Sequence, residues 1–318
     1  MGTLIMNKEF VSIIIPTYKR ATMLQRAISS ALEQTYSNIE VLVVSDNEPD
    51  DEFTAQARET VEGFNDPRVR LITQEKHING AVARNVGIKA SKGEYISFLD
   101  DDDYYEKDKI EKQVALLSSL DESWGGVCCR YKVYKQGKLV EVMPLFKSGK
   151  VYKEIIMRLI KTQTNCLLLR REALFKAGLF DESLLRHQDV QLLARFTYNY
   201  KLMCQDEFLN NLDQDDNMNR AKPEKVMELK RAFFASVKDI LDSFSVLEKY
   251  RFKMLTRFDI GALYILDGQK LRGMLHCLSI LLSPVATIQS FNKVLSKKKM
   301  AKLARNMEAS GNFPYRKL

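Results

Sequence analysis

Short runs of branched apolar residues alternate with helix-like patterns between Phe10 and Leu120, and this alternation constrains the fold more than any other feature. The predicted strands are Val11–Ile15, which Pro16 is expected to end, Ile39–Val44, Arg68–Thr73 and Glu94–Leu99. Helices are predicted around Leu24–Leu32, Asn79–Ser91 and Ile110–Leu117. Strands without polar alternation are typical of a mostly parallel sheet that helices cover on both faces, so the fold class is α/β.

The rest of the chain predicts a less regular second part and a helical tail. Strands are predicted for Gly125–Tyr134 and Thr164–Arg171, and a short helix is predicted to end at Gly178. A turn and a helix follow around "RHQDVQLLARF", and the pattern is helical from Pro223 onward. We therefore expect an α/β domain in residues 1–219, with halves of about 10–120 and 121–219, and a helical C-terminal region in residues 220–318.

The net charge of +8 is concentrated in the C-terminal region. From Arg220 to the end there are 20 Lys and Arg against 8 Asp and Glu, a balance of +12, so the preceding part carries −4. A basic region favours phosphate-rich partners such as nucleic acid or anionic lipid, although a solvated helical face has the same composition. Because no helix-turn-helix or aromatic-basic RNA-binding motif accompanies it, we expect no nucleic-acid partner.

A stretch without charged residues lies inside this basic region. Gly273–Asn292 has no Asp, Glu, Lys or Arg, but Pro284 interrupts it and polar residues dilute it. It is a poor transmembrane span, so we expect an interfacial helix pair in peripheral contact with a membrane, a pair that docks subunits in a homo-oligomer, or a helical subdomain that packs on the α/β domain. The five cysteines lack zinc-type spacing and no signal peptide is expected before Phe10, which favours a cytoplasmic location, at the inner membrane face if the tail binds lipid.

Polar or charged groups follow three of the predicted strands. These groups are Pro16–Tyr18, Asp46 and Asp100–Asp103. Because ligands bind at the carboxyl ends of the strands in open parallel sheets, these groups are the first candidates for a site. Asp46 could accept a hydrogen bond from a nucleobase imide or a ribose hydroxyl, or it could be a turn-forming residue.

The four consecutive aspartates are the most unusual motif in the chain. If the chain stays extended past Leu99, Asp100 and Asp102 point to the same side and can hold Mg²⁺ or Mn²⁺. Taken alone, such a motif is more often an acidic surface turn. Its place directly after a buried strand favours the metal site instead.

Two further segments carry candidate functional residues. In "ARN", Arg84 could reach a phosphate or a base, although a lone arginine is more often a surface residue or an ion-pair partner. In "RHQD", Arg186, His187 and Asp189 come together just before a predicted helix. Either Asp189 or His187 could act as a general base, and a helix N-cap is the structural alternative for Asp189.

The order and spacing of these segments resemble the family 2 glycosyltransferases, which have the GT-A fold. The segments that carry the resemblance are "VSIIIPTYKR", "IEVLVVSDNEPDDE", "NGAVARNVGIKASKGEYISFLDDDD" and "AGLFDESLLRHQD". It covers roughly Phe10 to Asn211 and implies a Rossmann-like nucleotide-sugar half fused to an acceptor half. The implied activity is a metal-dependent, inverting hexosyltransferase of cell-surface polysaccharide biosynthesis. It would move a sugar from a nucleotide sugar, most simply a UDP-sugar, to a hydroxyl of a glycan or lipid-linked glycan.

The resemblance also implies roles for individual residues. Lining of the nucleotide pocket is implied for Pro16, Thr17 and Tyr18, contact with the base for Asp46, and a place near the nucleotide for Arg84. Donor binding is implied for Asp100 and Asp101, coordination of Mn²⁺ or Mg²⁺ for Asp102, and a place outside the site for Asp103. The catalytic base would be Asp189, with Arg186 and His187 as acceptor or donor contacts.

The chain departs from the family pattern at one position. Gln188 stands where the family has an acid before the catalytic aspartate, which leaves Asp189 as the base and removes a neighbouring charge. The run of aspartates also leaves the register of the metal-binding pair open by one residue. The loop after Gly137 and the segment Thr162–Asn165 are weaker candidates for the acceptor site.

Two other function classes remain as alternatives. A nucleotidyltransferase can share the sheet and the acidic metal site, but it would normally have a glycine-rich loop after the first strand, and "PTYKRATM" has no glycine. A non-catalytic binding module could use the basic tail instead. Consumption of a nucleoside triphosphate, or salt-dependent binding of nucleic acid by the tail, would favour these alternatives.

Overall fold

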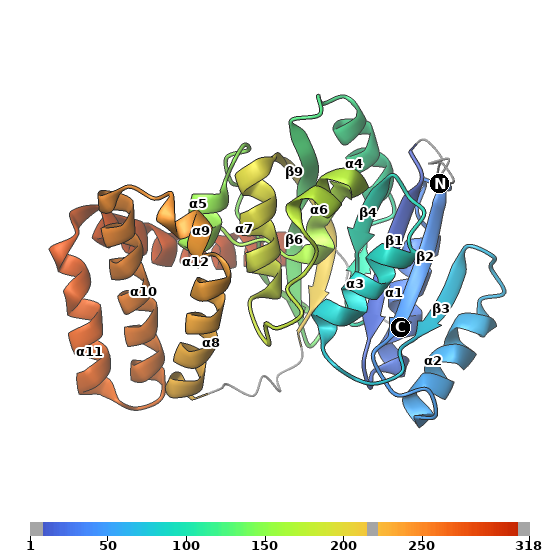
Figure 1. Ribbon diagram of the computed structural model, residues 1–318, viewed down its shortest axis with the longest axis horizontal. Helices are drawn as coiled ribbons and strands as arrows, with labels where there is room; N and C mark the ends of the chain where they lie inside the picture. Colours follow the sequence, from blue (N-terminus) through green and yellow to red (C-terminus); the bar gives the residue numbers. More distant parts are fainter. Residues whose placement is uncertain (1–8, 215–221, 311–318) are drawn as a thin grey trace.

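A nine-stranded mixed sheet forms the centre of the protein. The computed structural model describes residues 9–214 and 222–310, so the expected domain boundary at residue 219 lies outside the described residues. Within the described part, the strand order is β3-β2-β1-β4-β8-β6-β9-β5, and β7 pairs with β6. Helices cover both faces of the sheet, and the C-terminal helices stand beside one end of it (Figure 1).

The first four strands form the parallel half of the sheet, as predicted. They are β1 (Val11–Thr17), β2 (Ile39–Ser45), β3 (Val69–Thr73) and β4 (Tyr95–Phe98). Successive residues face opposite sides, so Ile13 lies in the core on one face and Ile14 in the core on the other. Burial on both faces explains why these strands are apolar throughout.

Pro16 does not end β1, contrary to the prediction. It lies within the strand, paired with Val44 of β2. On the other side of β1, strand β4 pairs only as far as Ile14. The missing N–H of the proline is tolerated because β1 has no pairing strand on that side at Pro16.

Four helices connect and cover the parallel strands. The helices α1 (Ala21–Leu32), α2 (Glu52–Gly63) and α4 (Lys109–Ser118) pack on one face, and α3 (Gly80–Ala90) packs on the other. Asn79 caps α3, since its Oδ1 accepts hydrogen bonds from the main-chain N–H of Ala81 at 2.9 Å and of Val82 at 3.2 Å. This cap fixes the start of the helix that carries Arg84.

The second part of the α/β half adds mixed pairing to the sheet. Its strands are β5 (Tyr104–Tyr105), β6 (Trp124–Lys135), β7 (Lys138–Val142), β8 (Leu167–Arg170) and β9 (Lys201–Asp213). Its helices are α5 (Tyr152–Ile156), α6 (Arg171–Ala177) and α7 (Gln188–Asn199). β8 runs antiparallel to β4 and β6, whereas β6 and β9 are parallel. The strand predicted from Thr164 begins at Leu167, because Thr164–Cys166 is a 3-10 turn.

The described C-terminal helices pack against the α/β half at two places, through Phe233 and Met254, which belong to its large core cluster, and through the last helix. They are α8 (Pro223–Ser236), α9 (Lys238–Asp242), α10 (Val246–Leu266), α11 (Lys270–Leu278), the 3-10 turn η2 (Ser279–Leu282) and α12 (Pro284–Ala309). In α12, Met300 and Ala304 are buried in one cluster with Tyr134 and Leu139 of β6 and β7. Across the described residues, none of the helices combines the length and the apolarity that a membrane span requires.

Candidate active site

The carboxyl ends of three parallel strands meet around Thr17. Strand β1 lies between β2 and β4 in the sheet. The main-chain oxygen of Thr17 accepts a hydrogen bond from the Asp46 N–H at 2.9 Å, and its hydroxyl donates to Asp101 Oδ2 at 2.7 Å. The buried Thr17 therefore joins two of the predicted acidic groups into one region.

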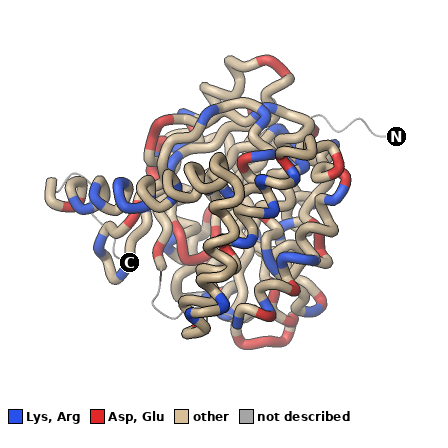
Figure 2. Tube along the Cα trace, turned by 90° about the vertical axis from the view of Figure 1, so that its left-hand side faces the viewer, with Lys and Arg blue, Asp and Glu red and all other residues tan. Residues whose placement is uncertain are grey.

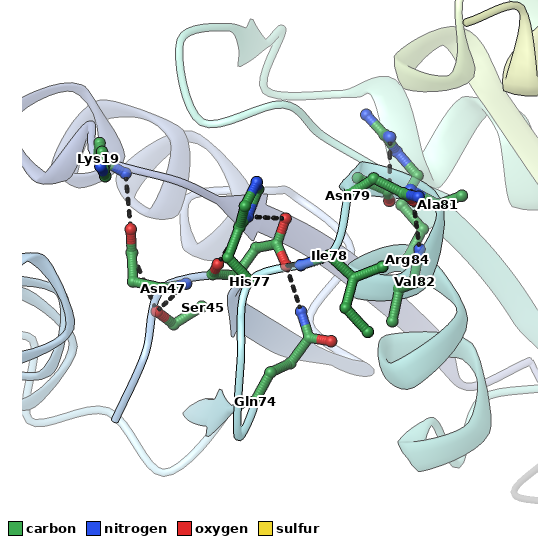
Figure 3. A network of polar contacts seen from close by, with 12 residues as sticks. Lys19, Ser45, Asn47, Gln74, His77, Ile78, Asn79, Ala81, Val82 and Arg84 are labelled. Carbon is green, nitrogen blue, oxygen red and sulfur yellow. Dashed lines mark hydrogen bonds and ion pairs between the residues drawn. The ribbon is translucent and has the colours of Figure 1, made fainter. Parts of the chain in front are cut away.

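The Asp46 carboxylate is held by the loop between β3 and α3, whose residues Gln74, His77 and Ile78 are labelled in Figure 3. Oδ1 accepts hydrogen bonds from Gln74 Nε2 at 3.0 Å and from the Ile78 N–H at 3.2 Å. Oδ2 lies 3.0 Å from His77 Nδ1. A carboxylate offers about four acceptor positions, so this buried group can accept one further donor, such as a nucleobase imide N–H.

An aromatic pair lies beside Asp46. The rings of Tyr18 and His77 stack with centroids 4.0 Å apart and planes 17° apart. Tyr18 is 38% exposed, and Pro16, two residues earlier, is half-buried. The main-chain N–H of Lys19 donates to Asn47 Oδ1 at 3.1 Å, which ties the end of β1 to the end of β2 (Figure 3). Such a partly exposed ring is suited to pack against a flat ligand.

The aspartate run forms a turn and does not stay extended, contrary to the prediction. The Asp103 N–H donates to the Asp100 main-chain oxygen at 3.1 Å, which places Asp101 and Asp102 at the centre of the turn. Side chains on a turn diverge, whereas those two apart on a strand share a face. The strand argument for pairing Asp100 with Asp102 therefore fails, although both remain on one short turn.

Two arginines are paired with carboxylates of this turn, those of Asp100 and Asp102. Asp100 Oδ1 accepts from Arg84 Nη2 at 2.5 Å, and Asp102 is ion-paired with Arg20. Burial raises the pKa of Asp101 to about 7, while burial and the charge of Asp100 raise the pKa of Asp102. Burial, and for Asp102 also the charge of Asp100, therefore disfavours the ionised form of these two carboxyl groups.

Asp103 points into the protein. It is buried and accepts hydrogen bonds from Asn165 Nδ2 and, at 2.9 Å, from the Asp213 N–H. Burial raises the pKa of its carboxyl well above the usual value. These contacts connect the aspartate turn to β9 and to the 3-10 turn Thr164–Cys166. They are compatible with the prediction that Asp103 lies outside the metal site.

The aspartate turn fits a divalent cation of the magnesium type. Asp100 and Asp102 repel each other across the turn, and a cation would relieve that repulsion. No group of three or more His, Cys, Asp or Glu side chains in the described residues could hold a metal ion. The turn would therefore supply few ligands, which suits Mg²⁺ or Mn²⁺ because such ions commonly complete their shell with water and substrate phosphate.

Helix α3 links the aspartate turn to the segment before α7. Asn85 is buried and exchanges two hydrogen bonds with the main chain of Phe180, at 2.9 and 3.0 Å, and Nδ2 also donates to Glu182 Oε1 at 2.8 Å. Arg84, the preceding residue, binds Asp100. The "ARN" element thus fixes the entry to α7 relative to the turn, a role for Asn85 that the sequence did not reveal.

Asp189 lies in the first turn of α7, inside the helix. The N-cap is His187, which has the left-handed φ of 64° and makes no side-chain capping bond, so the N-cap interpretation of Asp189 is wrong. Burial raises the pKa of the Asp189 carboxyl, and the positive charges of Arg84 and Arg158 oppose this effect. A carboxylate with a raised pKa is a stronger base than an exposed aspartate.

A cavity of about 290 Å³ opens beside Asp189. Its polar lining includes Arg158, Lys161, Thr162, Gln163 and Lys293 of α12. Thr162 and Gln163 belong to the segment that we expected at the acceptor site. Arg158 and Lys293 were not anticipated, because nothing local in the sequence places residues so far apart along the chain in one cavity.

The structure does not bring His187 or Arg186 to the aspartate turn. His187 Nδ1 lies 3.2 Å from Arg158 Nη1, and its ring packs edge-on against Phe233 of α8. Burial, and then the charge of Arg158, lowers the pKa of His187 to about 4, so its imidazole is neutral at pH 7 and weakly basic. Arg186 is exposed next to it. Asp189 is therefore the better-placed base of the two candidates.

Comparison with solved structures supports the same architecture. With residues 1–349 of S. aureus TarS in complex with UDP-GlcNAc, the TM-score is 0.58 at 17% identity, covering 96% of this chain and 93% of that chain. With the mannosyltransferase PcManGT from Pyrobaculum calidifontis in complex with GDP-Man and Mn²⁺, it is 0.59 at 16% identity, covering 95% and 88%. Identities this low bear on the fold alone, which is the GT-A fold with an added C-terminal helical region.

Comparison of sequences gives the family. The model of glycosyl transferase family 2 matches residues 12–178. The amylovoran biosynthesis glycosyltransferase AmsB of Erwinia amylovora is 32% identical over 194 residues, which are 58% of this chain and 62% of AmsB. The Escherichia coli enzyme WfgD, a UDP-Glc:alpha-D-GlcNAc-diphosphoundecaprenol beta-1,3-glucosyltransferase, is 38% identical over 112 residues, 35% of this chain and 42% of WfgD. The chain thus spans about three-fifths of AmsB. The chain belongs to glycosyl transferase family 2.

Proposed function

We propose that the protein transfers a hexose from a UDP-sugar to a hydroxyl of a glycan or lipid-linked glycan, with inversion at the anomeric carbon. The observation that carries the proposal is the position of Asp189. The charges of Arg84, which binds the aspartate turn, and of Arg158, which lines the cavity, both act on its carboxyl. A base between a donor-side and an acceptor-side group is the arrangement that a direct displacement needs.

The nucleotide would bind at the ends of β1 and β2. The Asp46 carboxylate has acceptor capacity for an imide N–H, and the exposed Tyr18 ring lies close by. Uracil presents such an imide N–H, which is why we favour uridine. The names of two similar proteins support this choice, since WfgD uses UDP-Glc and TarS was solved with UDP-GlcNAc. PcManGT, solved with GDP-Man, shows that a related fold accepts another base.

The donor diphosphate would lie at the aspartate turn. Asp102, with Asp100 on the same turn, would hold Mn²⁺ or Mg²⁺, and Asp101 would be fixed by the Thr17 hydroxyl. A bound divalent cation would supply positive charge where the departing nucleoside diphosphate becomes more negative. Arg20 pairs with Asp102 and Arg84 pairs with Asp100, and these ion pairs would keep the turn in one arrangement before the donor arrives.

Asp189 would accept the proton of the attacking acceptor hydroxyl. The acceptor would enter the cavity so that this hydroxyl reaches the carboxylate and its oxygen faces the anomeric carbon. The new bond would form on the side opposite the leaving diphosphate, which inverts the configuration. Asn85 would contribute indirectly, because its bonds to Phe180 and Glu182 hold the segment that leads to Asp189.

The acceptor is the least defined part of this proposal. AmsB is named for the biosynthesis of amylovoran, and the name of WfgD specifies a lipid-linked sugar diphosphate as its acceptor. We propose the same class here, in the biosynthesis of a cell-surface polysaccharide. A screen of nucleotide sugars for thermal stabilisation and for divalent-dependent release of nucleoside diphosphate tests the donor. Stabilisation by nucleoside triphosphates, together with release of pyrophosphate, would contradict a nucleotide-sugar donor.

We further propose that the C-terminal region, beginning near residue 220, contacts the cytoplasmic face of a membrane. Helices α10 to α12 expose a set of large apolar side chains, here called the apolar C-terminal face: Leu266, Leu271, Leu275, Leu278, Leu281, Leu282, Ile288 and Phe291. Each is more than half exposed. In Figure 2, which turns this end toward the viewer, the nearest helices carry long uncharged stretches.

Charge complementarity favours an anionic lipid surface as the partner. Basic residues flank the uncharged stretch, with Lys270 and Arg272 before it and Lys293 and Lys297–Lys299 after it. An apolar face flanked by lysines is typical of helices that lie in a membrane interface. The protein should co-sediment with phosphatidylglycerol vesicles, and Leu275→Asp should release it while Leu145→Asp, at an exposed apolar residue elsewhere, should not. Self-association without vesicle binding would indicate a homo-oligomer interface instead.

A further inference from the structure

Arg158 lines the same cavity as Asp189, the candidate base. In the part of the chain that the structure describes, Arg158 forms no ion pair with an acidic residue. It follows α5, lines the cavity and is half-buried. Within the described residues, its guanidinium has no carboxylate oxygen within 4.0 Å, and its side chain bonds only to His187 Nδ1, at 3.2 Å. The φ angle of Arg158 is 54°, in the left-handed region that residues other than glycine rarely adopt. A half-buried, strained and unpaired arginine in a cavity needs an explanation.

His187 does not neutralise Arg158. Burial and the neighbouring charges hold the pKa of His187 at about 4, so at pH 7 the imidazole is neutral and accepts a hydrogen bond from the guanidinium. This bond orients one edge of the guanidinium and leaves its remaining N–H groups for other acceptors. The positive charge of Arg158 therefore remains available to a ligand in the cavity.

Two lysines also line the cavity, and each lies near a carboxylate. Lys161 lies 3.5 Å from Glu141, which also lines the cavity, so its charge is largely offset there. Lys293 lies 3.1 Å from Asp259, a residue that is not part of the lining. Lys293 is on α12, two residues after Phe291 of the apolar C-terminal face. The same helix thus contributes to the cavity and to the surface that we expect to meet lipid.

We propose that Arg158, with Lys293, binds a phosphate or diphosphate group of the acceptor, which makes the acceptor an anionic sugar phosphoester of the lipid-diphosphate class. The inference rests on the proposed function and assigns two residues to the anionic group of the acceptor class proposed above. One guanidinium group can bind two phosphate oxygens through two parallel N–H donors, and this fixes the orientation of the phosphate. An acceptor anchored in this way would present its sugar hydroxyl to Asp189 and direct its lipid along α12 toward the membrane.

The test compares two synthetic probes that differ in one group. One is an alkyl-diphospho-N-acetylglucosamine, and the other is the alkyl N-acetylglucosaminide without the diphosphate. We expect the wild type to bind the diphosphate probe at least about tenfold more tightly than the other probe, which is the gain expected from one charge-assisted hydrogen bond. Arg158→Gln should remove this preference and leave the affinity for UDP within about twofold. Arg58→Gln, at an exposed arginine of α2, is the matched control and should change neither affinity.

Three outcomes would overturn the inference. The wild type could show no preference for the diphosphate probe, or Arg158→Gln could weaken both acceptor probes equally. If instead Arg158→Gln weakened UDP as strongly as the probe, the arginine would belong to the donor diphosphate. Should Arg158→Gln lower the melting temperature markedly, Lys293→Gln provides the same comparison at a second position and should reduce the preference severalfold. A wild type that binds no UDP-sugar at all would instead reject the proposed function.

Discussion

The proposed donor side and the proposed acceptor side of the site differ in how their charged groups are paired. On the donor side, the carboxylates of Asp46, Asp100 and Asp102 are already held by His77, Arg84 and Arg20. On the acceptor side, neither Asp189 nor Arg158 forms an ion pair within the described residues. The difference indicates that the fold arranges the proposed donor side in advance, whereas on the proposed acceptor side the charges of Asp189 and Arg158 are left for the substrate. Specificity for the acceptor is therefore expected to depend on few residues.

The largest effect is expected at Asp189. Asp189→Asn keeps the size of the side chain but removes the basic oxygen, so the transfer rate should fall about 10³-fold, within the range known for a lost general base. UDP affinity should stay within about twofold, because the donor contacts lie elsewhere. Steady-state rates and calorimetric titration with UDP measure the two effects. A parallel loss of rate and of UDP affinity would mean that the two sides are not separable.

A smaller effect is expected when the metal site is weakened. Asp102→Asn removes one charge from the aspartate turn, and the rate should fall about 10²-fold, with a higher Mn²⁺ concentration needed for half-maximal activity. Chelation with EDTA should abolish transfer by the wild type, and added Mn²⁺ should restore it. Asp121→Asn, at an exposed carboxylate, is the control. Full activity of Asp102→Asn in EDTA would exclude metal dependence.

A moderate effect on nucleotide affinity is expected at Asp46. Asp46→Asn replaces one acceptor oxygen by an amide, so UDP should bind about tenfold less tightly, which corresponds to about 1.4 kcal/mol. Binding of CDP, whose base has no imide N–H, should change less than that of UDP. Competition titrations with both nucleotides measure the ratio. An unchanged ratio would show that Asp46 supports the loop of His77 and does not contact the base.

The smallest effect concerns stability and comes from the acceptor side. The folded-state pKa of His187, about 4, is below its usual value of 6.5, so the unfolded chain binds more protons between these values. Stability should therefore fall as the pH decreases from about 6.5 to about 4, by about 1 kcal/mol after allowance for solvent screening. His187→Gln should flatten this part of the profile, measured as urea midpoints. An identical slope in both proteins would contradict the buried, neutral imidazole.

The two sides also differ in how much the sequence reveals. The position of Thr17, Asp46 and the aspartate run at one edge of the sheet could be predicted, because they lie at or just after the ends of apolar strands. Their role in donor binding stays a prediction. At Asp100–Asp103 the sequence left an extended segment and an acidic turn as alternatives, because an acidic run carries no signal for where extension stops. The partners of these groups, such as His77 and Asn85, lie in polar segments that have no periodic pattern.

Of the cavity lining, the sequence singled out only Asp189 and, more weakly, Thr162 and Gln163, and their role toward an acceptor stays a prediction. Arg158 and Lys293 reach the cavity through tertiary packing, and Lys293 does so because α12 returns to β6 and β7. Strand β9 was also missed, since its sequence "KLMCQDEFLNNLD" mixes polar and apolar residues without alternation. Such long-range contacts depend on how elements pack, which local patterns do not record.

The stereochemistry of the product tests the central claim most directly. With the α-linked UDP-sugar that the donor screen identifies, NMR coupling constants of the anomeric proton report the configuration of the new bond. Direct displacement with Asp189 as the base predicts a β-linked product, and Asp189→Asn should form it about 10³-fold more slowly. An α-linked product would contradict a single displacement at this site.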